Sequence, residues 1–177
     1  MNFDSADAVV LALYPITRGV AFALMKSPVA PIDWGIKGIE RGDRHASSLE
    51  KMAGLLGRNR PDAVVLEEPT APRLRRARGL ERLMRGIDRL AQNEGIDVYR
   101  YSRSAVQECF SRFGARTRYD IAAAIAARIP ALERFLPHRR KLWESEDPRM
   151  GIFCAAAVAL THYDLQAREV VQSEWTP

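Results

Sequence analysis

Short apolar runs near the start of the chain predict a group of β-strands. Residues 8–13 form a continuous apolar run that ends ahead of Pro15, and residues 19–25 repeat this pattern. Such runs are typical of strands that are buried on both faces of a sheet. After Pro15, the three residues 16–18 suit a tight hairpin before the second run, and residues 33–39 then alternate apolar and polar positions around Trp34. We therefore expect three consecutive strands that form an antiparallel meander.

Helical spacing replaces this pattern from residue 47 onwards. Apolar side chains recur every three or four positions over residues 47–56, and Gly57 ends the segment. The same reasoning predicts a buried strand, a long helix and a fifth strand, at residues 63–67, 73–93 and 96–101. The rest of the chain reads as helices at residues 104–113, 121–129 and from about 148 to beyond 163, with an irregular stretch between Pro130 and Pro137. Thr117 and Asp120 resemble a capping box ahead of the alanine-rich helix.

The predicted order is β-β-β-α-β-α-β followed by helices, which defines an α/β fold. The first three strands pair antiparallel, whereas the later two need helical crossovers and so run parallel to a neighbour. We expect one domain over residues 1–177, with a core at about residues 8–165. In such sheets, ligands bind at the carboxyl ends of strands where the strand order reverses. Those ends are residues 13–14 and 66–68.

Composition and charge narrow the class of protein. Of 177 residues, 47% are hydrophobic, which is enough for a sizeable core and excludes a wholly disordered chain. The formal net charge is +5, and 23 of the 27 basic residues are arginines. Arginine binds phosphate in a bidentate fork, so this bias points toward nucleic acid, although arginine-rich codon usage explains it equally well.

The cysteines and the N-terminus bear on where the protein works. Cys109 and Cys154 have no metal-ligand spacing around them, which argues against a zinc site or a disulfide framework. No apolar run reaches the length of a membrane span, and the acidic N-terminus lacks the basic region of a signal peptide. We expect a cytoplasmic protein without a membrane partner.

Three segments resemble the RNase H-like superfamily, and within it the crossover-junction (RuvC-like) resolvases. Residues 12–15, with Gly19 shortly after, resemble the family's first-strand motif, in which an apolar run leads to Asp-Pro. Residues 64–69 resemble its second motif, a buried strand that ends in a catalytic Glu, and residues 153–162 resemble its last helix. The resemblance implies an RNase H-like fold, with a five-stranded mixed sheet in the order βββαβαβα and helices on both faces. It also implies phosphodiester hydrolysis by two Mg²⁺ ions held by clustered carboxylates, and a homodimer that acts on branched DNA such as a four-way junction.

Several positions depart from the resolvase pattern. Tyr14 and Cys154 stand where the family has aspartates, and Gly151 stands at a position that is often acidic. Glu67 remains in place, and Asp147 is the candidate for a second catalytic carboxylate if the last helix starts a turn early. These two residues would form a weak site for Mg²⁺ or Mn²⁺ if the protein is active. The favoured alternative is that Asp147 is simply an acid at the positive end of a helix.

Two basic segments are candidate contacts for nucleic acid. Residues 73–89 hold seven arginines, which are Arg73, Arg75, Arg76, Arg78, Arg82, Arg85 and Arg89. Such a stripe can follow a phosphate backbone, although a solvated helix face with Glu81 and Asp88 as partners is the alternative. In residues 138–143, basic side chains precede Trp143, a combination that can grip single-stranded or distorted DNA or simply anchor a surface linker.

Three functions remain open from the sequence. The first is a protein that binds branched or distorted DNA on a resolvase-like fold and has lost or nearly lost cleavage. The second is an active, Mg²⁺-dependent structure-specific endonuclease with a rearranged metal site. The third is an interaction protein that binds no nucleic acid.

Overall fold

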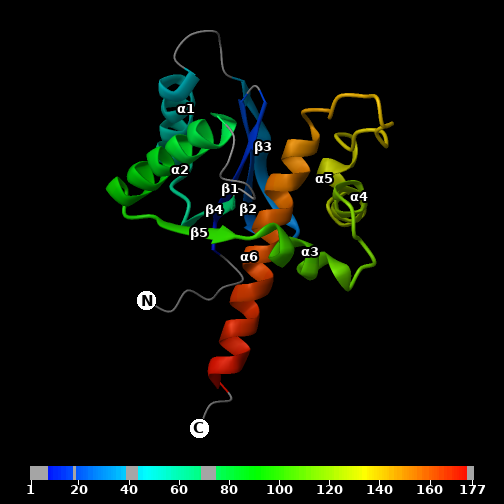
Figure 1. The fold of residues 1–177 in the computed structure, drawn as a ribbon. Coiled ribbons are helices and arrows are strands. Elements are labelled where there is room, and N and C mark those ends of the chain that lie inside the picture. The colour runs from blue at the N-terminus through cyan, green and yellow to red at the C-terminus, as the bar shows by residue number, and fades with distance from the viewer. Residues whose placement is uncertain (1–7, 18, 39–43, 69–74, 175–177) are drawn as a thin grey trace.

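The computed structural model describes residues 8–17, 19–38, 44–68 and 75–174 (Figure 1). Five strands are present in these ranges: β1 (Val10–Ile16), β2 (Gly19–Ser27), β3 (Ala30–Gly38), β4 (Ala63–Glu67) and β5 (Asp97–Tyr101). The helices are α1 (Arg44–Asn59), α2 (Arg75–Asn93), α3 (Arg103–Ser111), α4 (Arg118–Arg128), α5 (Pro130–Glu133) and α6 (Met150–Glu174). The predicted order of elements is confirmed.

The five strands form one mixed sheet in the order β3-β2-β1-β4-β5. The first three strands pair antiparallel as a meander, and β4 runs parallel to both β1 and β5. The strand order reverses between β1 and β4, because the meander extends to one side of β1 and the later strands extend to the other. The predicted five-stranded sheet is therefore confirmed, and its reversal point lies at the expected pair of strands.

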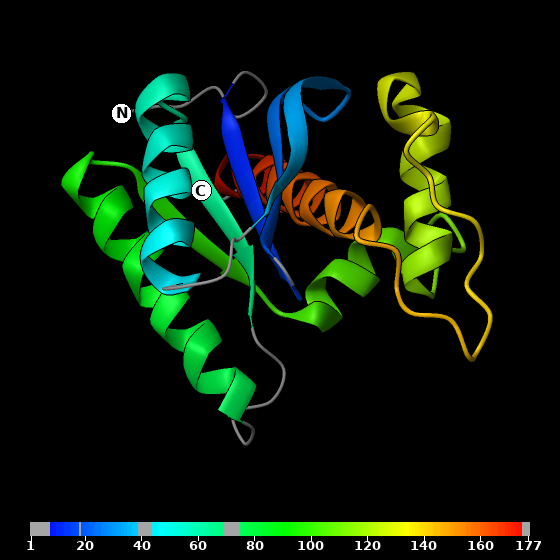
Figure 2. The same cartoon turned by 90° about the horizontal axis from the view of Figure 1, so that it is seen from above.

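Helices cover both faces of this sheet, as predicted (Figure 2). On one face, α1 and α2 pack against Leu11, Leu13 and neighbouring side chains in one apolar cluster. On the other face, α3, α4 and α6 pack against Val10, Ala12 and their neighbours in a second cluster. The alternation of β1 side chains between the two clusters follows from the two-residue period of a strand. No described helix is both long and apolar enough to cross a membrane.

Strand β1 continues past the point where the sequence analysis ended it. Pro15 lies inside β1 and opposes Val20 of β2. Proline lacks the N–H that a central strand must donate, but the pairing of β1 with β4 ends at Leu13 and Leu66. Beyond that pair, β1 has one open side, so proline is tolerated there.

Two local features of the helices bear on the site. The predicted capping box is confirmed, since the Thr117 hydroxyl accepts from Asp120 N at 3.1 Å and the Asp120 carboxylate accepts from Thr117 N at 3.0 Å. This box fixes the first turn of α4, which begins at Arg118. Short helix α5, which the sequence analysis treated as irregular, begins at Pro130, a residue that suits the first turn of a helix.

Candidate functional site

Tyr14 and Glu67 lie side by side at the carboxyl edge of the sheet. Their strands run parallel, and each residue comes directly after the registered pair Leu13 and Leu66. Because side chains alternate along a strand, both residues face the side of the sheet that α6 covers. Glu68 is exposed and takes the next position along the chain, so its side chain is not expected to share the site with Glu67.

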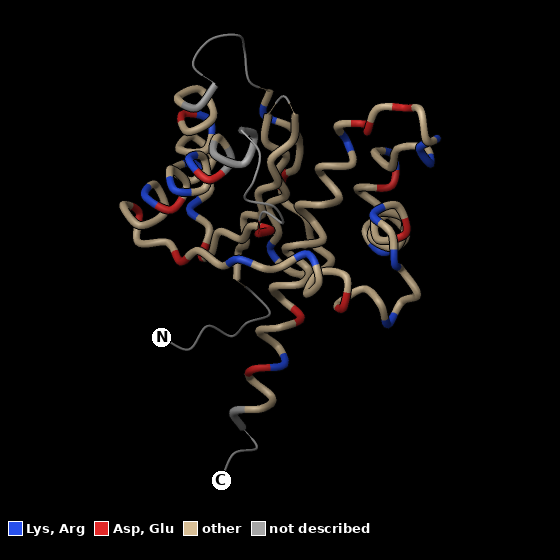
Figure 3. Tube along the Cα trace, in the orientation of Figure 1, with Lys and Arg blue, Asp and Glu red and all other residues tan. Residues whose placement is uncertain are grey.

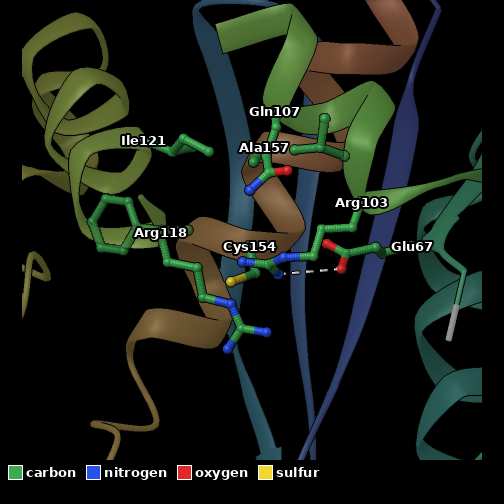
Figure 4. Close-up of a pocket in the computed structure, with 9 residues that line it drawn as sticks. Glu67, Arg103, Gln107, Arg118, Ile121, Cys154 and Ala157 are labelled. Atoms are coloured by element: carbon green, nitrogen blue, oxygen red, sulfur yellow. Dashed lines mark ion pairs between the residues drawn. The ribbon is translucent and has the colours of Figure 1, made fainter. Parts of the chain in front are cut away.

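Cys154 reaches the same place from α6. Together with Glu67 and side chains of α3 and α4, it lines a cavity of about 20 Å³, which is room for roughly one water (Figure 4). Burial raises the pKa of the Cys154 thiol to about 11, and the Arg118 guanidinium opposes this shift only in part. Burial, followed by the influence of Cys154, likewise raises the pKa of the Tyr14 phenol. Both groups are therefore neutral at physiological pH.

Two arginines occupy the space around these side chains. Arg103, the first residue of α3, pairs with Glu67, with 3.5 Å between Nη1 and Oε1. Arg118, the first residue of α4, donates from Nη2 to the Tyr14 hydroxyl at 2.9 Å. Figure 4 shows the two side chains approaching Cys154 from different helices. The site thus holds two guanidinium groups beside the carboxylate at the end of β4.

Glu146 holds the other end of the Arg118 guanidinium. Nη1 of Arg118 donates to both carboxylate oxygens of Glu146, at 3.0 and 3.1 Å. Glu146 belongs to the loop between α5 and α6, so Arg118 links β1, α4 and this loop. The Arg118 Nε is buried and has no hydrogen-bond partner among the described residues. One of the five donors of this guanidinium is therefore left without an acceptor among these residues.

Asp147 does not join Glu67 in the structure. Its carboxylate accepts from Arg149 Nη2 at 2.6 Å and from Arg149 N at 2.9 Å, and this pairing lowers the pKa of Asp147. It lines a separate cavity of about 270 Å³ between the α5–α6 loop and α4. Helix α6 begins at Met150, so Asp147 lies ahead of the helix and not on the same helical face as Cys154. Its catalytic and metal-binding role stays a prediction.

Gly151 marks a tight contact between α6 and the meander. A Cβ atom at this position would lie 2.6 Å from the Ile16 Cγ2 and 2.8 Å from the Ala21 Cβ. Neither of these atoms is the end of a flexible side chain, so no carboxylate fits here unless the backbone moves. Because residue 151 is glycine and not an acidic residue, α6 can pack directly against Ile16 and Ala21 of the sheet.

The side chains at this site do not fit a two-metal centre. Mg²⁺ and Mn²⁺ prefer oxygen ligands, and carboxylates above all. Among the described residues, no group of three or more His, Cys, Asp and Glu side chains lies close enough to hold a metal ion. Glu67 contributes one carboxylate that Arg103 already neutralises, while Tyr14 and Cys154 are neutral. Two arginine side chains thus lie where metal ions would need negative ligands.

Part of the arginine stripe lies on the exposed side of α2. Arg82, Arg85 and Arg89 are exposed and have no ion pair with another described residue. Asp88, expected as one of their partners, pairs instead with Arg100 on β5. Arg73 lies outside the described residues, as do the side chains of Arg75, Arg76 and Arg78.

Arg103 is the site residue that the sequence analysis missed. It follows β5 directly, after the helix N-cap Ser102. Because β5 is parallel to β4, the residues after both strands meet at the same edge of the sheet, and this is the signal that could have identified Arg103. Arg118 was visible only as a basic residue at the start of a helix, since nothing in the sequence indicates that it reaches Tyr14, 104 positions away.

The sheet order and the helices on both faces define an RNase H-like fold. Among solved structures, Thermus thermophilus RuvC in complex with a Holliday junction substrate superposes with a TM-score of 0.69 and 18% sequence identity, covering 90% of this chain and 96% of that chain. The yeast mitochondrial Holliday junction resolvase Ydc2 has a TM-score of 0.61 and 12% identity, covering 93% and 83%. The fold that the resemblance implied is thereby confirmed. No protein-family model matches the chain, and a search of curated proteins finds no significant match.

Proposed function

We propose that the protein binds branched or otherwise distorted DNA without a divalent cation, and that it cleaves this DNA little or not at all. The observation that carries the proposal is the position of Arg103 and Arg118 beside Glu67, Tyr14 and Cys154. A guanidinium group can neutralise a phosphate and bind two of its oxygens, as a metal ion does. It cannot supply the metal-bound hydroxide that attacks the phosphorus in a two-metal nuclease.

The ion pairs within the site suggest that DNA is held mainly by cations on either side of it. Arg103 with Glu67 and Arg118 with Glu146 leave the site close to neutral, so most of the attraction for DNA must come from unpaired cations nearby. In Figure 2, α2 and the α5–α6 loop lie on opposite sides of the strands that end at the site. Figure 3 shows basic residues along both segments. A DNA molecule with strands that diverge could contact both segments at once.

Branched DNA is favoured over simple duplex by the fold. The solved relatives include a RuvC bound to a Holliday junction substrate and a Holliday junction resolvase. The step from fold to ligand is an analogy, because one fold can carry unrelated functions. A junction has two-fold symmetry, so we also propose that the active species is a homodimer. Light scattering should then give the mass of two chains.

A junction-binding assay tests the proposal. Fluorescence anisotropy compares a four-way junction with a duplex of the same arm sequence, in EDTA and in Mg²⁺, across a range of salt concentrations. We expect the junction to bind more tightly than the duplex, equally well in EDTA, and more weakly as salt rises. A parallel assay should detect no nicking in Mg²⁺ or Mn²⁺.

Two variants show whether the site itself contacts the DNA. Arg103→Gln removes a cation from the site, and we expect it to weaken junction binding about tenfold, the size of a charge-assisted hydrogen bond. Arg100→Gln is the matched control, because Arg100 is an arginine of β5 that is ion-paired away from the site.

Absence of any DNA binding by the unmodified protein would favour the interaction protein. Mg²⁺-dependent nicking would favour the active endonuclease.

A further inference from the structure

Two large apolar side chains stand in solvent at the tip of the α5–α6 loop. Leu142 is 94% exposed and Trp143 is 80% exposed. They are adjacent in the chain, and neither belongs to the two apolar clusters of the core. Tryptophan is normally buried over most of its surface because it offers a large apolar area. An exposed pair of this size therefore marks an interaction surface.

A closed turn presents this pair. The Glu144 amide donates to the Lys141 carbonyl oxygen at 3.1 Å, and the Glu144 carboxylate accepts from the Lys141 amide at 2.9 Å. The two bonds close a four-residue turn in which Leu142 and Trp143 are the central residues. His138 Nε2 donates to the same carboxylate at 3.2 Å. The tip is thus held in one conformation, so less entropy is lost when it binds a ligand.

The same loop is fixed to the candidate site. Glu146 lies two residues beyond the turn and binds Arg118 with both carboxylate oxygens, and Arg118 in turn binds Tyr14. The loop also forms one wall of the cavity of about 270 Å³ that α4 closes on the other side. The loop that carries the apolar tip is therefore anchored to the site through Glu146.

The charges around the tip are positive and largely unpaired. Each acidic side chain of the loop already has a partner within the loop or on α4: Glu144 with His138, Glu146 with Arg118 and Asp147 with Arg149. The cations ahead of the tip have no ion pair with another described residue, and these are Arg139, Arg140 and Lys141. Lys141 Nζ lies 5.6 Å from the centre of the Trp143 ring. An exposed aromatic ring beside several cations suits a nucleic acid, because its bases are flat rings and its phosphates are negatively charged.

We propose that Trp143 stacks on a base of DNA whose pairing is interrupted, while Arg140 and Lys141 contact the phosphates on either side of that base. This rests on the proposed function and names the part of the DNA that the loop recognises, which is the unpaired or loosely paired base at a branch point. Every base has a π-face, so stacking needs no particular sequence. Within a continuous duplex, the bases are already stacked and paired, so Trp143 adds affinity only where the duplex is interrupted.

Variants of the full chain test this inference. The probes are a four-way junction with 2-aminopurine at the branch point and a duplex of the same arm sequence. We expect Trp143→Ala to weaken junction binding by about 5- to 100-fold, the size of one base stack, and to leave duplex binding within twofold. Trp143→Phe keeps an aromatic face and should retain most of the affinity. Val29→Ala is the control, because Val29 is an exposed apolar residue of the β2–β3 turn.

The 2-aminopurine signal supplies an independent readout. Its fluorescence should change on binding of the unmodified protein and not on binding of Trp143→Ala at saturating concentration. If the unmodified protein binds no junction, the proposed function itself fails. If it binds and Trp143→Ala binds equally well, the stacking proposal is overturned and the proposed function stands. Equal weakening of junction and duplex, or a change in oligomeric mass in Trp143→Ala, also overturns the stacking proposal.

Discussion

The Arg118 guanidinium donates a hydrogen bond to the Tyr14 hydroxyl, with 2.9 Å between Nη2 and the phenol oxygen. This contact joins the first turn of α4 to the end of the central strand β1. It also explains why a bulky phenol is accommodated at a strand end where resolvases of this fold are expected to carry a carboxylate. The neutral phenol and the cation satisfy each other without a metal ion.

Removal of this hydrogen bond should destabilise the protein. Tyr14→Phe leaves a donor of Arg118 without its acceptor, and we expect the free energy of unfolding to fall by about 1–2 kcal/mol. Partial exposure of Arg118 lets water replace some of this interaction. The control is Tyr119→Phe, which keeps the ring that Arg139 covers and should change the free energy of unfolding by less than about 0.5 kcal/mol. Urea denaturation measures both, and equal effects would contradict the assigned role of Tyr14.

The contact at Gly151 should tolerate no side chain. Gly151→Ala places a Cβ against Ile16 and Ala21, and we expect it to lower the free energy of unfolding by about 1–3 kcal/mol through overpacking. Gly54→Ala is the matched control, since Gly54 is an exposed glycine of α1 with open space around its Cβ position. That change should raise stability by about 0.5–1 kcal/mol, because alanine favours helix. A neutral Gly151→Ala would mean that α6 does not pack so closely on the meander.

The exposed arginines of α2 should carry part of the affinity for DNA. Reversal of Arg82, Arg85 and Arg89 to Glu should weaken junction binding and reduce the slope of log K against log salt by roughly 0.9 for each phosphate that is no longer neutralised. The control reverses three exposed cations on elements outside α2 and the α5–α6 loop, Lys26, Arg58 and Arg128. If the slope is the same in the two triple variants, the α2 arginines only keep that helix solvated.

Buried His162 should make stability depend on pH. Burial lowers its pKa to about 4, from an ordinary value of 6.5. Between these values the unfolded chain binds a proton that the folded protein does not, so stability falls as pH decreases through this range. We expect the fall in the free energy of unfolding between pH 7 and pH 5 to be about 2 kcal/mol.

A variant isolates this contribution from those of the carboxylates. His162→Gln removes the titrating ring and keeps a polar group near the Tyr101 hydroxyl, which lies 2.7 Å from His162 Nδ1. The pH dependence of its free energy of unfolding between pH 7 and pH 5 should be flatter by the same amount. An unchanged dependence would show that folding does not lower the pKa of His162.

The fold could be predicted from the sequence because its signals are local. Apolar runs at 8–13 and 63–67, helical spacing in the segments that follow, and the Thr117–Asp120 capping box each depend on neighbouring residues. Strand ends were harder to predict, since the tolerance of Pro15 within β1 depends on where β4 stops pairing. The site could be located at Tyr14 and Glu67 from the reversal of strand order. Its arginines could not be, because the contacts of Arg118 with Tyr14 and Glu146 span 104 and 28 positions.

The central claim is that arginines take the place of metal ions at this site, and it leads to an expectation for metal binding. The unmodified protein should bind Mg²⁺ and Mn²⁺ weakly. Tyr14→Asp and Cys154→Asp together should raise the affinity more than either change alone, because ligands of one site act together. Addition of Arg118→Ala to the pair should raise it further, since a cation that would neutralise the new carboxylates is then removed.

Calorimetric titration of Mn²⁺ into these variants is the most direct measurement, with circular dichroism to establish that each one is folded. The account predicts only weak binding to the unmodified protein, and tight binding that appears first in the double variant and strengthens in the triple variant. Strong binding of Mn²⁺ by the unmodified protein would contradict it. So would a folded triple variant that gains no affinity at all, because the site would then lie elsewhere.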